Sequence, residues 1–356
     1  MEKRYVPGLG HVSAIGAGCW TIGGLATNDG VPVGWTGVDE DEAYSALVRA
    51  HDLGITLYDT ADAYGLGQSE RLVGRLLTTA NRDRLTVSSK VGYVRGNAAH
   101  PYERDQILRQ FDATLDNLGT DYLDLYSLHS SDFGPDHRYL GEAAKTLREL
   151  RDQGLIKAIG MRAPHEFCLA WAEDVSHPRC AEASAFMLRF AVVQPDVLTV
   201  RYNMLSPLYE PMDADIFDLA NECGVGVLIK QALGQGLLVG AHRTDLPRTF
   251  PLGDHRRGDP KFSPAAVGAV RHGLRQLGAD FGYTRADLTR MALQYALQRS
   301  ENAALLVGFR TAQQISVNVA AVGDPLTAPE IDQIQSVMAF VRETIASLTD
   351  TQEKSP

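Results

Sequence analysis

Short apolar runs alternate with amphipathic stretches along most of this chain. Runs such as 225–229 and 303–306 are near-continuously apolar, which is typical of parallel strands buried on both faces of a sheet. In the stretch 103–118, apolar residues recur with the helical period and predict an amphipathic helix. The chain therefore reads as alternating strands and helices, the pattern of a parallel α/β fold.

The predicted elements cover nearly the whole chain. Residues 5–18 read as short strands around a Pro-Gly turn. Further strands are predicted at 55–58, 84–89, 122–128, 156–160, 196–201, 225–229 and 303–306. Helices are predicted at 39–54, 69–79, 103–118, 139–153, 213–223, 263–278, 285–299, 311–321 and 328–347, with a helical region from about 165. Periodicity alone does not distinguish an open, doubly wound sheet from a closed barrel.

Two connections are longer than a minimal alternation of strands and helices needs. Residues 164–195 are expected to hold two short helices. Residues 238–284 contain a long loop, HRTDLPRTFPLGDHRRGDPKF, before a helix. Loops near strand ends commonly carry function, so we expect these segments to form substrate walls. The tail, residues 350–356, is expected to be disordered.

Composition and length fit an ordinary globular protein. The chain has 356 residues, of which 44% are hydrophobic and 22% charged. The length allows two domains, but α/β barrels often exceed about 200 residues as a single unit. We therefore expect one domain over residues 1–349.

Net charge and cysteine content limit the classes of partner and the cellular compartment that we expect. A net charge of −10 and a pI of about 5.5 argue against nucleic acid or an anionic membrane as the main partner. An anionic ligand would then need a local basic pocket. The four cysteines are scattered without a CxxC spacing, and MEKRYVPGLG at the N-terminus has no apolar run. We expect a cytoplasmic protein with reduced thiols and no membrane span.

The strongest candidate site lies in residues 54–77, GITLYDTADAYGLGQSERLVGRLL. A short strand runs straight into Asp59, a polar turn carries Tyr64, and Ser69 begins a helix. The C-terminal ends of strands are where α/β barrels place their chemistry. Taken alone, Asp59 could equally cap the next helix and Tyr64 could lie on the surface.

Three stretches together resemble the signature of the aldo-keto reductases. In that family a strand-end Asp is followed five residues later by the catalytic Tyr, as Asp59 and Tyr64 are here. A Lys and a His at the ends of the next two strands complete the set, and Lys90 and His129 match them. The resemblance implies a closed (β/α)8 TIM barrel with extra helices, in which an N-terminal β-hairpin plugs the floor.

The reaction implied by the resemblance is reduction of a carbonyl by hydride from a nicotinamide. Tyr64 would donate the proton, and Lys90 would lower its pKa by stabilising the phenolate. Asp59 would provide the counter-charge for Lys90, and neutral His129 would orient the carbonyl. The alternative is a purely structural role, in which Lys90 and Asp59 form an ion pair and His129 is a core histidine.

The cofactor implied by the resemblance is NADPH/NADP+, and no metal is implied. The segment LLVGFRTAQQISVNVAA resembles the family's pattern at the last strand-to-helix junction, where backbone N–H groups suit a phosphate. Arg310 matches the residue that meets the adenosine 2′-phosphate, while the family's Glu is Val317 here. The other matched cofactor positions are Gly18, Trp20, Leu233, Gly236, Leu237, Gly308, Gln314 and Asn318.

Three positions depart from the family where the nicotinamide would be held. Arg162 stands where a Ser is common, Thr199 replaces a Gln, and Lys230 begins the segment that usually reads Tyr-Ser-Pro-Leu. Arg162 and Lys230 are expected to face the cofactor or an anionic group of the substrate. Alternatively, Arg162 turns outward and pairs with Glu166.

The resemblance implies an NADPH-dependent oxidoreductase that reduces an aldehyde or ketone to an alcohol. The pattern is closest to the branch of bacterial sugar-phosphate reductases and potassium channel β subunits. An NADP-binding regulatory or scaffold subunit with vestigial reductase activity is therefore the alternative. A cofactor-free lyase or isomerase is a third hypothesis. The expected partner is a small-molecule carbonyl substrate, and the oligomeric state stays open.

Overall fold

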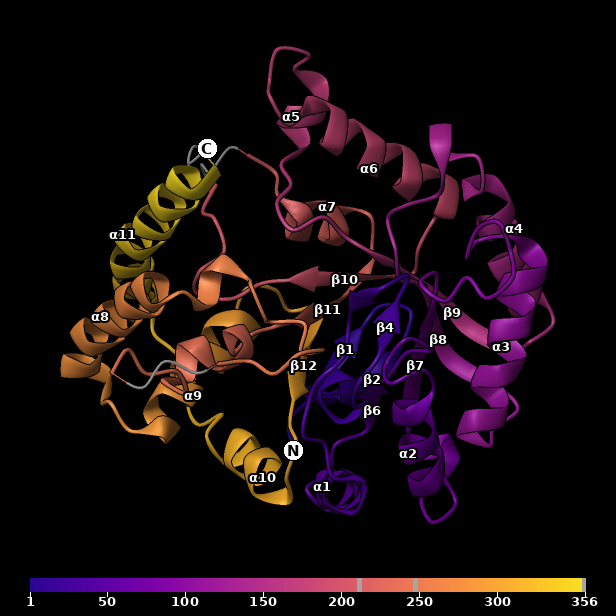
Figure 1. The fold of residues 1–356 in the computed structure, drawn as a ribbon, viewed down its shortest axis with the longest axis horizontal. Helices are drawn as coiled ribbons and strands as arrows, with labels where there is room; N and C mark the ends of the chain where they lie inside the picture. Colours follow the sequence, from indigo (N-terminus) through magenta and orange to yellow (C-terminus); the bar gives the residue numbers. More distant parts are fainter. Residues whose placement is uncertain (210–212, 246–248, 354–356) are drawn as a thin grey trace.

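The computed structural model describes residues 1–209, 213–245 and 249–353. Its centre is a closed barrel of parallel strands in the order β10-β11-β12-β3-β6-β7-β8-β9 (Figure 1). The barrel strands are β3 Ile15–Gly18, β6 Leu57–Asp59, β7 Thr86–Val91, β8 Leu123–Leu128, β9 Ile156–Arg162, β10 Val197–Arg201, β11 Gly226–Lys230 and β12 Ala303–Gly308. The predicted (β/α)8 barrel is confirmed.

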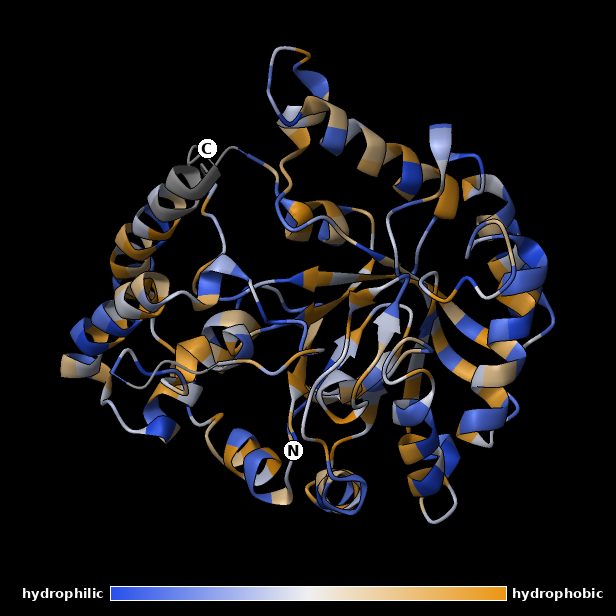
Figure 2. Ribbon diagram, viewed as in Figure 1, coloured by the Kyte–Doolittle hydropathy of each residue, from blue (hydrophilic) through white to orange (hydrophobic). Residues whose placement is uncertain are grey.

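Helices surround the barrel on its outside (Figure 1). They are α1 Glu40–Asp52, α2 Gln68–Leu77, α3 Arg104–Leu118, α4 Leu140–Asp152, α5 Leu169–Glu173, α6 Cys180–Val193, α7 Ile216–Glu222, α8 Pro264–Phe281, α9 Arg285–Leu297, α10 Ala312–Ala320 and α11 Ala328–Glu353. Apolar residues concentrate on the strands and on the helix faces that meet them (Figure 2). Among the described residues, no helix has the length and apolar character that a membrane span needs.

Local signals explain where the helices begin and end. The Asp39 side chain accepts a hydrogen bond from the backbone N–H of Glu42 and caps α1. After α1, Gly54 has φ +84°, a conformation that glycine adopts readily, and it ends the helix as expected. Thr284 and Asp287 form a capping box at the start of α9. These helix boundaries were therefore readable from short-range sequence patterns.

The N-terminal hairpin plugs the barrel floor, as predicted. Strands β1 Lys3–Val6 and β2 Gly10–Ser13 pair antiparallel. Their Val6 and Val12 side chains are fully buried in a core cluster inside the barrel, together with Leu57 and Leu125. The contact is close, because a Cβ added to Gly226 would lie 2.3 Å from the carbonyl oxygen of Pro7. This apolar packing occupies the end of the barrel opposite the strand C-termini.

Several predicted boundaries need correction. The last helix ends at Glu353 rather than at 347, so residues 350–353 are helical and do not belong to a disordered tail. Residues 354–356, like 246–248 of the predicted long loop, lie outside the described residues. A small hairpin of β4 Thr27–Asn28 and β5 Val31–Pro32 lies between β3 and α1, where no strand was predicted. The segment 164–195 holds two helices as predicted, but α6 is a long one.

Candidate functional site

A pocket of about 470 Å³ opens at the C-terminal ends of the barrel strands, and we call it the main pocket. Parallel strands end at the same rim of a barrel, so residues far apart in the sequence meet there. The chain contributes residues to the main pocket from the C-terminal end of every barrel strand. These strand-end residues are Gly18, Asp59, Lys90, His129, Arg162, Thr199, Lys230 and Gly308.

Asp59 and Lys90 form a buried ion pair at the bottom of the main pocket. Lys90 Nζ lies 2.7 Å from Asp59 Oδ2 and donates a second hydrogen bond to the carbonyl oxygen of Thr60 at 2.5 Å. The Ser88 hydroxyl donates to the other Asp59 oxygen at 3.0 Å. Burial alone would lower the pKa of Lys90, but Asp59 and Tyr64 outweigh it, and the pKa is raised. Lys90 is therefore a fixed cation.

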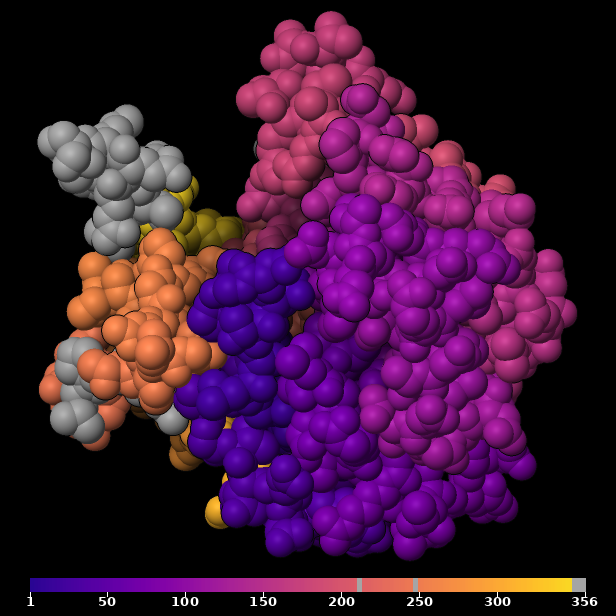
Figure 3. Space-filling view, turned by 45° about the vertical axis from the view of Figure 1, so that its right-hand side comes forward, coloured from indigo at the N-terminus to yellow at the C-terminus, as the bar shows by residue number. Residues whose placement is uncertain are grey.

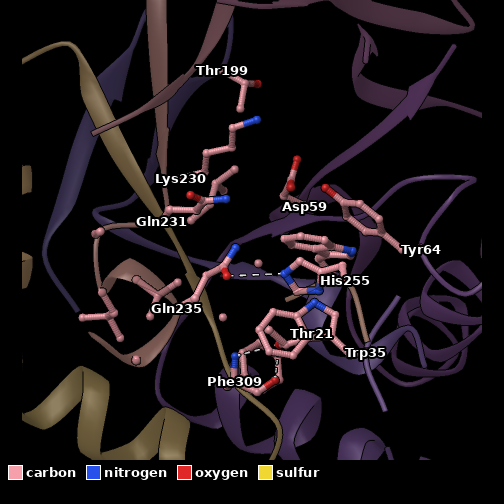
Figure 4. Close-up of a pocket in the computed structure, with 18 of the residues that line it drawn as sticks. Thr21, Trp35, Asp59, Tyr64, Thr199, Lys230, Gln231, Gln235, His255 and Phe309 are labelled. Atoms are coloured by element: carbon pink, nitrogen blue, oxygen red, sulfur yellow. Dashed lines mark hydrogen bonds between the residues drawn. The ribbon is translucent and has the colours of Figure 1, made fainter. Parts of the chain in front are cut away.

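Tyr64 lies beside Asp59 of this ion pair (Figure 4). Lys90 Nζ is 4.7 Å from the centroid of the Tyr64 ring, and the ring meets His129 edge-on at a centroid distance of 5.6 Å. Burial raises the pKa of Tyr64 to about 12, although the nearby Lys90 acts to lower it. Lys90 thus acts in the predicted direction, but the net pKa of Tyr64 is raised instead of lowered, because desolvation of the phenolate exceeds the attraction of the ammonium.

His129 is neutral, as predicted. Burial lowers its pKa well below the ordinary value, and the positive charges of Lys90, Lys230 and Arg162 add to this effect. Its ring packs edge-on against Tyr93 at a centroid distance of 4.6 Å. Its Nδ1 is buried and has no hydrogen-bond partner among the described residues. The imidazole therefore remains available for an uncharged hydrogen bond.

Arg162 reaches the main pocket and does not pair with Glu166. Its guanidinium donates to the Tyr93 hydroxyl at 2.9 Å, and a second nitrogen lies 3.0 Å from His165 Nε2. Glu166 is instead bound by Arg179. Of the two predicted placements, the one inside the pocket is the one observed, and both partners of Arg162 are neutral groups.

Lys230 and Thr199 line the same side of the main pocket, but Lys230 is not a fixed cation. Burial and the charges of Arg162 and Lys90 lower the pKa of Lys230 to about 7. Among the described residues, its amine has no hydrogen bond or ion pair. Next to it, Gln231 has φ +61°, and its carbonyl oxygen accepts a hydrogen bond from the Asn203 amide at 2.9 Å. Figure 4 shows Lys230 and Thr199 at one end of the pocket.

The other end of the main pocket lies at the junction of β12 and α10. Arg310, Gln314 and Asn318 line it, as expected for cofactor residues. The Gln314 side chain accepts from the Arg310 backbone N–H at 2.9 Å, and Asn318 donates to the carbonyl oxygen of Gly308 at 3.4 Å. The Arg310 guanidinium donates to the backbone carbonyls of the β5–α1 loop, with a distance of 2.5 Å to Thr36.

The loop after β11 forms a further wall. It contains the 3-10 helix η4 Gly234–Val239, in which Gly236 has φ +95°, a conformation that favours glycine. Leu233 and Gly236 line the main pocket as expected. Leu237 does not, because its side chain is buried in the hydrophobic core.

Two segments that are distant in the sequence close over the pocket. The backbone of Gly34 pairs with that of Asp254, and Thr36 donates to the Asp254 carboxylate at 3.1 Å. The two segments lie side by side in Figure 3, where indigo meets orange. Burial acts to raise the pKa of Asp254, but hydrogen bonds from Arg256 outweigh it and hold this pKa well below its usual range. This carboxylate therefore stays ionised and fixes the two loops together.

Sequence reasoning missed the aromatic groups that these loops bring into the pocket. The His255 ring packs against Trp20 and Trp35 at centroid distances of 4.2 and 4.6 Å, and its Nε2 lies 3.4 Å from the Gln235 amide oxygen (Figure 4). Tyr93, which binds Arg162, was also missed. These residues lie in irregular loops without a periodic pattern, so no sequence signal pointed to them.

The main pocket has the features that an extended dinucleotide phosphate requires. It runs from Tyr64 and His129 to the start of α10, whose backbone N–H groups and positive dipole suit an anion. Arg310 supplies a positive charge at that end. Gly236 allows the chain to turn closely at the wall between the two ends. The residues present therefore fit a nicotinamide dinucleotide.

Comparisons with known proteins agree with this geometry. The model of the aldo/keto reductase family matches residues 14–339. The NADH-specific methylglyoxal reductase of Escherichia coli is 26% identical over 324 residues, covering 87% of this chain and 90% of that protein. Aldo-keto reductase YhdN of Bacillus subtilis is 28% identical over 345 residues, covering 95% and 94%. The structure of the glycerol dehydrogenase AKR11B4 from Gluconobacter oxydans matches with a TM-score of 0.73 and 25% identity, covering 95% of each chain.

Proposed function

Because this chain belongs to the aldo/keto reductase family, we propose that it reduces an aldehyde or ketone with NADPH and that Tyr64 donates the proton. One observation carries the proposal. The buried Lys90–Asp59 pair lies beside Tyr64 and His129 in a pocket that extends to Arg310. An oxidoreductase of carbonyl groups needs a proton donor and a hydride donor on one carbon–oxygen bond, and this pocket has room for both.

The proton-transfer step follows from the pKa values in the site. NADPH, when bound, supplies the hydride to the carbonyl carbon. Tyr64, with a pKa of about 12, is a protonated phenol at neutral pH and gives its proton to the carbonyl oxygen as charge develops there. The resulting phenolate is stabilised by Lys90, whose own charge is fixed by Asp59.

His129 has the role of orienting the carbonyl group. It is uncharged because burial and the surrounding cations lower its pKa, so its N–H is a neutral hydrogen-bond donor. A donor aimed at the carbonyl oxygen polarises the bond without competing for the proton of Tyr64. Tyr93 holds the ring from the other side and keeps it facing the pocket.

The cofactor assignment is the finer part of the proposal. Arg310 supports NADPH, since a guanidinium pairs well with a phosphate and has nothing comparable to meet at a 2′-hydroxyl. The Escherichia coli relative is named as NADH-specific, so the preference needs a direct measurement. The residues proposed to hold the cofactor are Gly18, Trp20, Arg162, Lys230, Leu233, Gly236, Gly308, Arg310, Gln314 and Asn318.

The proposal predicts a specific defect for Tyr64→Phe. This change should slow carbonyl reduction at least ~10²-fold, because it removes the general acid, and should leave the affinity for NADPH nearly unchanged. Reduction is followed by loss of NADPH absorbance over a panel of aldehydes and ketones. Affinity is followed by tryptophan fluorescence, since Trp20 and Trp35 lie in the pocket.

Tyr5→Phe is the matched control, because Tyr5 is exposed on the hairpin at the barrel floor. It should behave as wild type in both measurements. Near-normal reduction by Tyr64→Phe would refute the assignment of the proton donor. Wild-type protein that binds NADPH but reduces no member of the panel would favour the regulatory or scaffold subunit instead.

A further inference from the structure

A second cavity, of about 580 Å³, lies beside the main pocket, and we call it the basic hollow. Arg162 and His165 line both cavities, so these two side chains form a wall that the cavities share. The other cations that line the basic hollow come from β10, from α6 and its start, and from the 3-10 helix η5 Pro260–Phe262. They are Arg201, Arg189, Arg179 and Lys261.

The carboxylates that line the basic hollow are already occupied. They are Glu166 and Glu182, and both are bound by Arg179, with a distance of 2.8 Å to Glu182. The two carboxylates exceed the charge of Arg179 by one, and through space Glu166 also acts on Arg201 and Lys261, and Glu182 on Arg189. Five cations against two lining carboxylates still leave the hollow with net positive charge. Asp259, which lies outside the lining, acts on Arg201 and Lys261 only through space.

The remaining four cations have no carboxylate partner within the described part of the chain. Arg162 bonds to Tyr93 and His165, and burial with the neighbouring cations lowers the pKa of His165 to about 3, so that ring is neutral. For Arg189, Arg201 and Lys261 the described residues provide no side-chain hydrogen bond and no ion pair. The basic hollow is therefore lined by positive charges that have no ion-pair partner among the described residues.

This arrangement is costly unless an anion enters the hollow. Arg189 is 9% exposed, and taking a guanidinium out of water without a partner is unfavourable. Burial lowers the pKa values of Arg189 and Arg201 and outweighs the opposing effects of Glu182 on Arg189 and of Glu166 on Arg201, while Arg162 lowers the pKa of Arg201 further. Like charges at this spacing repel each other, while a phosphate or carboxylate between them would make charge-assisted hydrogen bonds with several.

The strand register places these cations within reach of the reaction centre. Arg162 of β9 lies opposite Thr199 of β10, and Arg201 lies opposite Lys230 of β11. Arg162, Arg201 and Lys230 thus stand at the C-terminal ends of three successive barrel strands. One substrate could therefore place its carbonyl in the main pocket and its anionic group in the basic hollow, with the atoms between them lying beside Arg162.

We propose that the basic hollow binds the phosphate or carboxylate end of the carbonyl substrate, with Arg162, Arg201, Arg189 and Lys261 as its ligands. The inference rests on the proposed function, because it assumes that the main pocket holds the carbonyl. It assigns the substrate class as aldehydes or ketones that bear an anionic group a few atoms from the carbonyl.

The first test compares two aldehydes that differ in one group, glyceraldehyde and glyceraldehyde 3-phosphate. Wild-type enzyme should show a higher kcat/KM for the phosphorylated aldehyde. Arg201→Gln and Lys261→Gln should each lower kcat/KM for the phosphorylated aldehyde about tenfold more than for glyceraldehyde, the effect of one lost charge-assisted hydrogen bond. Lys261 is exposed at the rim of the hollow, so its replacement leaves the fold intact.

Arg84→Gln is the matched control, since it removes the same charge from an exposed position just before β7, at the other end of the barrel. It should leave the ratio of the two kcat/KM values as in wild type. A wild-type enzyme without preference for the phosphorylated aldehyde, or a preference that both variants retain, would overturn the proposal.

The second test separates this site from the proposed catalysis. Calorimetric titration of the protein with glycerol 3-phosphate and with glycerol needs no turnover. The anion site is supported if glycerol 3-phosphate binds and glycerol does not, and if that binding is weakened in Arg201→Gln and unchanged in Arg84→Gln. This outcome would support the site even if no carbonyl were reduced. Equal binding by Arg201→Gln and wild type would refute it. Inorganic phosphate should compete with glyceraldehyde 3-phosphate and should not stimulate reduction of glyceraldehyde; stimulation would indicate a free effector anion instead.

Discussion

At the end of β11, the charge of Lys230 is set by its surroundings rather than by its residue type. Burial, Arg162 and Lys90 lower its pKa from 10.5 to about 7. The folded protein therefore resists protonation of Lys230 at pH values where the unfolded chain accepts it. Between these two pKa values the unfolded state binds more protons, so the stability of the folded state rises with pH.

Lys230→Met should consequently stabilise the protein, and most strongly below about pH 7, where the full cost of protonating the buried amine is present. The gain should shrink as pH rises from about 7 and vanish near the unfolded pKa. Chemical denaturation of both proteins at about pH 6 and about pH 9 measures the two free energies of unfolding. A gain that does not change with pH would show that Lys230 titrates normally.

Lys157→Met provides a control of opposite sign. Asp124 outweighs burial and raises the pKa of Lys157, and their atoms lie 2.8 Å apart. This group therefore stabilises the folded state at every pH below its unfolded pKa. The variant should lose a small amount of stability, because Lys157 is largely exposed and Asp124 keeps its ion pair with Arg82, and the loss should be the same at both pH values.

At the scale of elements, we propose that the junction of β12 and α10 sets the cofactor preference. Thr311 caps α10 by accepting a hydrogen bond from the Gln314 backbone N–H, and Gln314 lines the main pocket beside Arg310. Arg310 stands just before this cap and donates to the carbonyls of the β5–α1 loop, including that of Thr36. The junction thus combines a helix terminus, a cation and a loop contact in one place.

Arg310→Ala should weaken NADPH binding by about 1.5–3 kcal/mol, the value of a hydrogen bond to a charged group, with little effect on NADH. Fluorescence titration with each nucleotide measures the difference. Arg310→Lys should retain part of the preference, because it keeps the charge but loses the planar fork. Equal losses for both nucleotides would mean that Arg310 acts only through the loop that it holds.

At the scale of the whole molecule, the barrel separates its stabilising core from its chemistry. The apolar cluster inside the barrel fills the floor, around Leu125 and the hairpin valines, while the charged groups gather at the strand C-termini. We propose that residues 1–349 fold as a single unit around this core. Changes at the floor should then affect stability without changing the chemistry of the folded enzyme.

Leu125→Ala should lower the free energy of unfolding by about 2–5 kcal/mol, because it leaves a cavity in a fully buried site. The activity per folded molecule should stay close to that of wild type. Val175→Ala, at a position that is 93% exposed, is the control and should change stability by less than about 0.5 kcal/mol. Two separate unfolding transitions, with only one shifted by Leu125→Ala, would contradict a single folding unit.

The sequence by itself determined the order of the strands and helices and the four residues at their ends. Asp59, Lys90 and His129 each lie at the end of a short apolar run, and Tyr64 lies on the turn that follows one of them. These features depend on local signals, namely hydrophobic period, caps and turns, so they can be predicted without knowing the tertiary structure. Barrel closure was implied by the resemblance and not by the periodicity.

The tertiary structure alone decided how charged the site is. The pKa of Tyr64 rises because desolvation exceeds the effect of Lys90, and neither the burial of the phenol nor its distance from Lys90 can be read from residue types. Leu237, matched by pattern to the cofactor, turns into the core. Trp35 and His255 meet across the pocket, and Arg201 and Lys261 meet at the basic hollow. Both pairs join segments that are distant in the chain. Only the folded barrel fixes the distance between the two residues of each pair and shields them from water.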